Sequence, residues 1–180
     1  MLDSDVLAWR YEAGGDERFF HDLGEVREII EPSITRLAAL HATSGDRKQI
    51  VELCEELNNA AHEPNNERYL EIDQAFHMAI LRASHNELLI QLGDVIQIAL
   101  RISRQLTASV VDNTVSAMPL HWEIARGIDA QDHVGAELAM RALLRKTATD
   151  IAQRLGTVSS DRESIMAKGE SLDFSRSSDN

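Results

Sequence analysis

The chain has 180 residues, of which 43% are apolar, and its formal net charge is −12. This length suits one domain of ordinary size with a real core. The negative charge, without any dense cluster of lysine and arginine, argues against nucleic-acid binding by this chain itself. The single cysteine, Cys54, excludes an internal disulfide and a cysteine-rich metal site. No apolar run approaches the ~20 residues of a membrane-spanning helix and the N-terminus has no signal-peptide pattern, so we expect a cytoplasmic protein.

The composition is typical of an all-α protein, because prolines are few and Ala, Leu, Glu, Arg and Gln are abundant. Residues 1–15 are expected to form a lead-in, residues 16–156 the helical body, and residues 157–180 a polar tail. Apolar residues recur at helical spacing in six segments of the body. The expected helices cover approximately residues 16–42, 46–57, 69–85, 86–107, 119–128 and 132–156.

Several breaks between these helices follow from the residues present. Pro32 lacks a backbone donor, so we expect a kink or break near Glu31. The stretch 109–118 has the weakest periodicity and predicts a loop, after which Pro119 suits the first turn of a helix. Gly156 is expected to end the last helix.

The segment from residue 69 to 87 carries the first chemical signal. Asp73 and His77 are four residues apart, so on a helix they share one face. That face also carries Phe76 and Ile80, which directs the pair toward the core. Buried Asp and His side chains need partners. The spacing alone fits either a metal site or a hydrogen-bonded pair without metal.

Five short sequence segments within residues 1–155 form a pattern through their order and spacing. They are Leu2-Asp3-Ser4-Asp5-Val6-Leu7-Ala8-Trp9, Glu25-Val26-Arg27-x3-Glu31-Pro32, Asp73-x2-Phe76-His77, Ala83-Ser84-His85-Asn86, and His121 followed by Asp129 and a long alanine-rich helix. Together they resemble the C-terminal effector-binding domain of FadR-subfamily GntR transcription regulators, the FCD domain. Within that family, the chain is similar to the branch of galactonate-operon repressors.

The resemblance implies an antiparallel bundle of six to seven helices around an internal cavity for ligand and metal. It also implies a metal held by one aspartate and three histidines. Asp73, His77 and His121 match three of these ligands, but the fourth position, 22 residues after His121, is Leu143. Either three protein ligands hold a metal here, or the metal has been lost and the polar residues bind the effector directly.

A carboxylate and two imidazoles with open positions suit Zn, Ni, Fe or Mn. The resemblance predicts a small carboxylic acid, in particular a sugar acid, as the effector. Arg27 matches an arginine that such domains direct into the cavity, where a guanidinium suits a carboxylate. A surface ion pair with Glu31 is the alternative reading of Arg27. Arg101 is a weaker candidate for effector binding, because an arginine in the middle of a helix is more often solvated.

The resemblance also places a winged-helix domain before residue 1, through which alone DNA would be contacted. This chain would then be the sensing and dimerisation half of a homodimeric regulator, and no catalysis is expected. Effector binding would shift the helices and thereby the spacing of the two winged-helix domains. Two alternatives stay open. Two histidines and a carboxylate are also the ligands of non-haem iron oxygenases, and the Asp73–His77 pair could be structural in a helical dimerisation module.

Overall fold

The computed structural model describes residues 17–63, 66–91, 93 and 111–173, and no strand occurs among them. The all-α prediction is confirmed. The described helices are α2 (Glu17–His41), α3 (Ser44–Ala60), α4 (Glu67–Ala83), α6 (Val111–Asp129) and α7 (His133–Asp173). Residues 87–91 are also helical. The predicted lead-in 1–15 and the predicted helical segment 94–107 lie outside the described residues.

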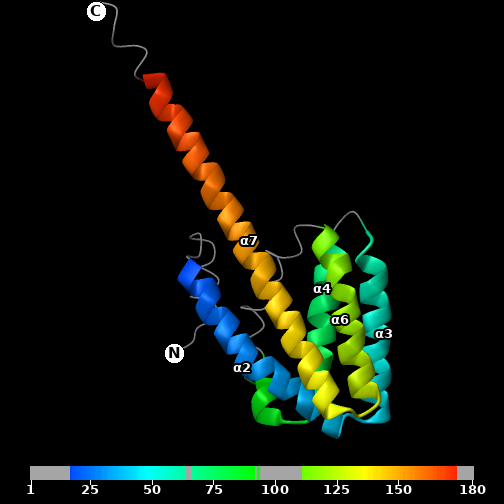
Figure 1. Ribbon diagram of the computed structural model, residues 1–180. Coiled ribbons are helices and arrows are strands. Elements are labelled where there is room, and N and C mark those ends of the chain that lie inside the picture. The colour runs from blue at the N-terminus through cyan, green and yellow to red at the C-terminus, as the bar shows by residue number, and fades with distance from the viewer. Residues whose placement is uncertain (1–16, 64–65, 92, 94–110, 174–180) are drawn as a thin grey trace, which may run out of the picture.

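Helices α3, α4 and α6 lie side by side, and α2 and α7 run obliquely across them (Figure 1). Helix α2 packs against α7, α4 and α6, while α6 packs against α7 and α3. The last part of α7 extends beyond the other helices (Figure 1). The core contains side chains from all of these elements, the largest fully buried apolar ones being Phe76, Ile50, Leu57, Ile80, Ile124, Ile128 and Met140.

Helix α2 is continuous through Pro32, so the break predicted near Glu31 does not occur. Pro32 is itself fully buried and contributes to the core. The inward face of α2 is not wholly apolar. Ile29 is 70% exposed, whereas Arg27 and Glu31 are buried at 4% and 6% exposure. Two ionisable residues therefore lie on the inward face of α2, whereas the apolar Ile29 faces solvent.

The turns around α3 and α4 are fixed by polar side chains. Thr43 is the N-cap of α3, and its reciprocal bonds with Asp46 form a capping box, so the helix begins slightly earlier than predicted. Helix α4 ends before Ser84, as predicted, and His85 then adopts a positive φ of 49°. The Asn86 side chain accepts hydrogen bonds from the backbone amides of Leu88 and Leu89 and so caps the helix that follows.

Two helix boundaries were wrongly predicted. Helix α6 begins at Val111 and includes Pro119, so residues 111–118 do not form a loop. Pro119 cannot donate to the carbonyl of Val115, but both residues are exposed, and water can satisfy that carbonyl. Helix α7 continues through Gly156 to Asp173. Residues 157–173 contain no proline, and one glycine costs a helix only about 1 kcal/mol.

Helices α6 and α7 approach closely where a short turn joins them. A Cβ atom on Gly127 would lie 2.9 Å from the backbone nitrogen of Ala136, so only glycine fits there without movement. The Asp132 side chain caps α7 by accepting a bond of 2.9 Å from the amide of Gly135. None of the helices in the described part of the chain combines the length and apolarity that crossing a membrane would need.

Candidate functional site

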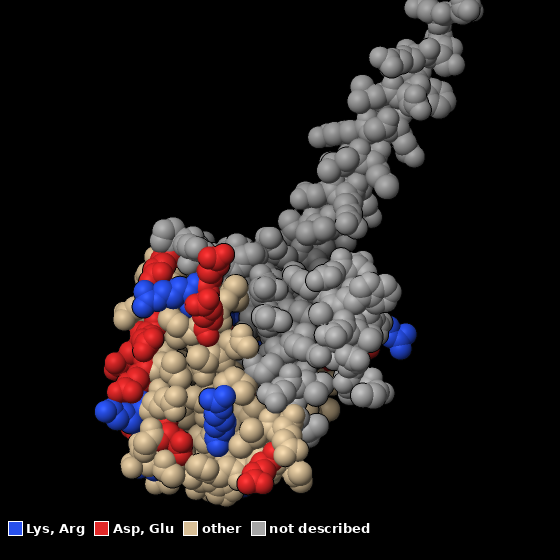
Figure 2. All heavy atoms as spheres, turned by 180° about the vertical axis from the view of Figure 1, so that it is seen from behind, with Lys and Arg blue, Asp and Glu red and all other residues tan. Residues whose placement is uncertain are grey.

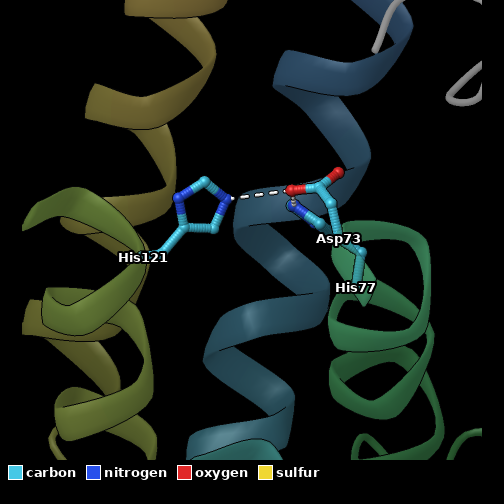
Figure 3. A group of neighbouring side chains, drawn as sticks. All are labelled: Asp73, His77 and His121. Atoms are coloured by element: carbon cyan, nitrogen blue, oxygen red, sulfur yellow. Dashed lines mark hydrogen bonds and ion pairs between the residues drawn. The ribbon is translucent and has the colours of Figure 1, made fainter. Parts of the chain in front are cut away.

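Asp73, His77 and His121 form a buried cluster in the middle of the bundle (Figure 3). Asp73 and His77 lie one turn apart on α4, and His121 reaches them from α6. The Asp73 Oδ1 atom lies 3.1 Å from His121 Nε2 and 3.8 Å from His77 Nε2. All three residues are at most 8% exposed. The three residues that were predicted as metal ligands therefore lie together.

The geometry of this cluster fits a single metal ion. One ligand atom from each of the three residues lies within 4.8 Å of the other two. Ligand atoms that share one metal at about 2.1 Å are roughly 3.0–3.4 Å apart. The two measured separations from Asp73 Oδ1, 3.1 Å and 3.8 Å, are close to this range. The ligand atoms of the two histidines also lie within 4.8 Å of each other.

The hydrogen bonds of His121 favour a metal-binding tautomer. Its Nδ1 atom lies 3.0 Å from the carbonyl oxygen of Ala117, which can only accept a hydrogen bond. Nδ1 therefore carries the proton, and in the neutral ring Nε2 presents a lone pair toward Asp73 Oδ1. The Nε2 lone pair and the Asp73 Oδ1 atom are both acceptors, so at 3.1 Å they require a cation or a proton between them. Metal-bound histidines are held by this kind of bond on the second nitrogen.

The polar cluster continues on α2, where no metal ligand was predicted. Glu31 Oε2 lies 3.3 Å from His77 Nδ1, and Glu31 Oε1 accepts a bond of 2.6 Å from Arg27 Nε. The predicted pairing of Arg27 with Glu31 therefore exists, but it is buried rather than on the surface. With both imidazoles neutral, these five side chains carry a net charge of −1. A divalent cation would change that charge to +1, which suits an anionic ligand.

The sequence singled out two further positions, Leu143 and Arg101. Leu143 is 4% exposed on α7, within the apolar core, and offers no ligand atom. Arg101 lies outside the described residues. Glu31 was missed as part of the cluster, although a signal existed. Residues 27, 31, 34 and 38 follow helical spacing, and the apolar members Ile34 and Ala38 mark that face as inward.

A small cavity adjoins the Glu31 end of the cluster. Its volume is about 30 Å³, and its walls come from α2, α4 and α7 together with Gly93. Glu31, Thr35 and His77 supply polar groups, and the other walls are apolar, including Met140. This volume accepts one or two water molecules. A larger ligand would have to displace side chains.

The FCD domain family model matches residues 22–146 of this chain. The metal-free FCD domain of TM0439 superposes with a TM-score of 0.65 at 22% identity, covering 79% of this chain and 97% of that one. Escherichia coli McbR/YncC gives a TM-score of 0.69 at 16% identity, covering 77% of this chain and 70% of that one. Both solved structures thus share the fold.

Curated relatives are regulators of transcription rather than enzymes. The chain is 40% identical over 92 residues to the galactonate operon transcriptional repressor of Escherichia coli K12, covering 51% of this chain and 39% of the repressor. A second protein of that strain, named for regulation of the L-lactate dehydrogenase operon, is 35% identical over 133 residues, covering 72% of this chain and 50% of that protein. The chain thus spans half the length of these relatives or less. By its family match, its fold and these relatives, the chain belongs to the FCD domain family.

Proposed function

We propose that this chain is the effector-sensing and dimerisation domain of a GntR/FadR-type transcription regulator. In this proposal a divalent metal is held by Asp73, His77 and His121, and a small carboxylic acid binds beside it. The observation that carries the proposal is the buried three-residue cluster, whose ligand atoms lie within 4.8 Å of one another. When bound, a transition metal with open positions supplies coordination sites for carboxylate and hydroxyl oxygens.

The charge balance of the cluster supports an anionic effector. The side chains of Arg27, Glu31, Asp73, His77 and His121 with a divalent metal sum to +1 when the imidazoles are neutral. A buried net charge is costly, and one carboxylate would cancel it. Arg27 is already bound to Glu31 at 2.6 Å, so an acid that binds Arg27 directly would have to replace that partner.

Two relatives suggest effectors of different size. One is named for the galactonate operon, and the other is named for the L-lactate dehydrogenase operon. The cavity of about 30 Å³ would have to widen for either acid. Both acids should be tested as ligands, each together with Zn, Ni, Fe or Mn.

DNA binding is proposed to reside in a winged-helix domain outside this chain. On the described part of the surface in Figure 2, acidic and basic side chains alternate and no broad basic patch forms. The net charge of −12 agrees with this division of roles. A homodimer in the cytoplasm would then transmit effector binding through helix shifts.

The proposal is tested by elemental analysis and thermal unfolding of protein purified without chelator or metal affinity resin. We expect about one equivalent of metal, and a rise in Tm of roughly 5–10 °C when stripped protein receives metal at about 100 times its Kd. Asp73→Ala should lose both effects, whereas Asp150→Ala on α7 should keep them. A hydroxy acid should then raise Tm further only in metal-loaded protein.

A protein that neither retains nor binds any of the four metals would contradict the metal site. In that case, a rise in Tm caused by the acid alone would still support effector binding by the polar cluster itself. The absence of any response to metal and acid would leave only the dimerisation role.

A further inference from the structure

The two nitrogens of the His77 ring face carboxylates on different helices. Nε2 lies 3.8 Å from Asp73 Oδ1 on α4, and Nδ1 lies 3.3 Å from Glu31 Oε2 on α2. All three side chains are nearly excluded from solvent, with at most 7% exposure. A neutral imidazole carries only one proton, so the two carboxylates compete to decide which nitrogen donates and which presents a lone pair.

We propose that Glu31 is a positioning residue for His77, accepting a hydrogen bond from Nδ1–H so that Nε2 is presented to the metal. This inference rests on the proposed metal site. A carboxylate hydrogen-bonded to the remote nitrogen of a metal-bound histidine fixes its tautomer and orientation and raises its basicity. Glu31 occupies that place relative to His77 and would not itself touch the metal.

Arg27 makes Glu31 a fixed acceptor. Its Nε atom donates to Glu31 Oε1 at 2.6 Å, which leaves Oε2 directed at His77. The side chains of this pair are 5% and 7% exposed, so solvent does not compete strongly for either. Arg27 thus holds the carboxylate in place and limits its rotation.

The chain needs this support because its candidate site has only three protein ligands. The other imidazole is already held, since His121 Nδ1 lies 3.0 Å from the carbonyl oxygen of Ala117. For His77 the corresponding acceptor is Glu31 Oε2, which lies 3.3 Å from Nδ1 on a different helix. With Leu143 offering no fourth ligand, a misoriented His77 would leave only Asp73 and His121 in place.

The test compares two double variants, Arg27→Met/Glu31→Gln and Arg27→Met/Glu31→Leu. Both remove the buried ion pair and so avoid leaving one charge unpaired, and the new side chains have similar volumes. Only glutamine retains an oxygen that can accept a hydrogen bond from His77 Nδ1–H. Zn²⁺ is the probe, with its affinity measured by competition against a chelator. Glu137→Gln, which disrupts a half-exposed pair with Arg141 on α7, is the matched control.

We expect the Glu31→Leu double variant to bind Zn²⁺ about 10- to 100-fold more weakly than the Glu31→Gln double variant. The control should match the wild type. Equal Zn²⁺ affinity in the two double variants, with tight binding by the wild type, would overturn the role of Glu31 and leave the metal site intact. A wild-type protein that binds no metal would overturn both.

The wild-type part of a second measurement does not depend on the variants folding. Nitrogen-detected NMR of the histidine rings in metal-free wild-type protein should show His77 with its proton on Nδ1. In the Glu31→Leu double variant the Nε2-protonated form should appear, because Asp73 then becomes the remaining carboxylate acceptor. Wild-type His77 protonated on Nε2 alone would contradict the proposal.

Discussion

Asp73 Oδ1 and His121 Nε2 lie 3.1 Å apart although the two residues are 48 positions apart in the chain. Their contact joins α4 to α6, and the contact of His77 with Glu31 joins α4 to α2. One buried polar cluster therefore links three helices. A ligand or metal that draws these side chains together would change how the three helices pack, which is the kind of shift that regulators transmit.

Restoring a histidine at position 143 should strengthen metal binding. Position 143 is where the resemblance to FCD domains expects the fourth ligand, and Leu143 is buried on α7 at 4% exposure. We expect Leu143→His to raise Zn²⁺ affinity by at least about 10-fold and to destabilise the metal-free protein by about 1–3 kcal/mol, because it buries a polar ring. Chelator competition and urea unfolding measure these two effects.

Leu144→His is the matched control, since Leu144 is equally buried at 4% exposure but points about 100° away around the helix. It should destabilise the protein without tightening Zn²⁺ binding. Equal gains from both variants, or no gain from Leu143→His, would show that position 143 does not face the metal ligands.

Much of the site could be predicted because its signals are local in the sequence. The spacing of Asp73 and His77 and the apolar residues beside them fix a shared inward face on one helix. The place of His121 came from the resemblance and not from periodicity. Glu31 was missed because a pair four residues apart on a helix is most often solvent-exposed, and only the packing of α2 against α4 buries it.

The wrong helix ends share one physical cause. Pro32, Pro119 and Gly156 are each unfavourable inside a helix, and the sequence alone makes them natural boundaries. In the structure the helices continue through all three. Pro32 is buried in the core, and for α2 and α6 the packing against neighbouring helices outweighs the loss of a single backbone bond. Local propensity is a weak guide where tertiary contacts are extensive.

Breaking the Arg27–Glu31 pair from one side should be strongly destabilising. Arg27→Met leaves a buried carboxylate without its charged partner, and we expect a loss of about 3–5 kcal/mol in the free energy of unfolding. Lys48→Met, in the exposed Lys48–Glu52 pair with side chains 77% and 57% exposed, should change it by less than about 1 kcal/mol. Urea unfolding compares the two, and similar losses would contradict the burial of the Arg27 pair.

The thiol of Cys54 should be inert in the folded protein. Desolvation by burial raises its pKa to about 12, so almost no thiolate forms at pH 8. We expect native protein to react with iodoacetamide far more slowly than a free thiol, and denatured protein to react at the ordinary rate. Mass spectrometry at timed intervals measures both rates. Rapid alkylation of native protein at pH 8 would show that Cys54 is accessible.

The acid dependence of the α3 cap should follow the ionisation of Asp46. A hydrogen bond from the Thr43 hydroxyl, with a smaller contribution from His85, holds the pKa of Asp46 below its ordinary value of 3.8. The bond from Thr43 Oγ1 to Asp46 Oδ2 is 2.6 Å long, and His85 Nε2 lies 2.9 Å from the same oxygen. A lowered pKa in the folded state means that ionised Asp46 stabilises the fold above about pH 3.8. This stabilisation is lost as the pH falls through the lower, folded-state pKa.

Asp46→Asn should therefore cost roughly 0.5–1 kcal/mol at pH 7 and at pH 5, and less at pH 3. Urea unfolding at the three pH values measures this difference. Carboxyl-carbon NMR titration gives the pKa directly, and Thr43→Ala should raise it more than His85→Ala does, because the Thr43 hydroxyl makes the larger contribution. An Asp46 pKa at or above 3.8 in the wild type, or a larger effect of His85→Ala, would contradict this account of the cap.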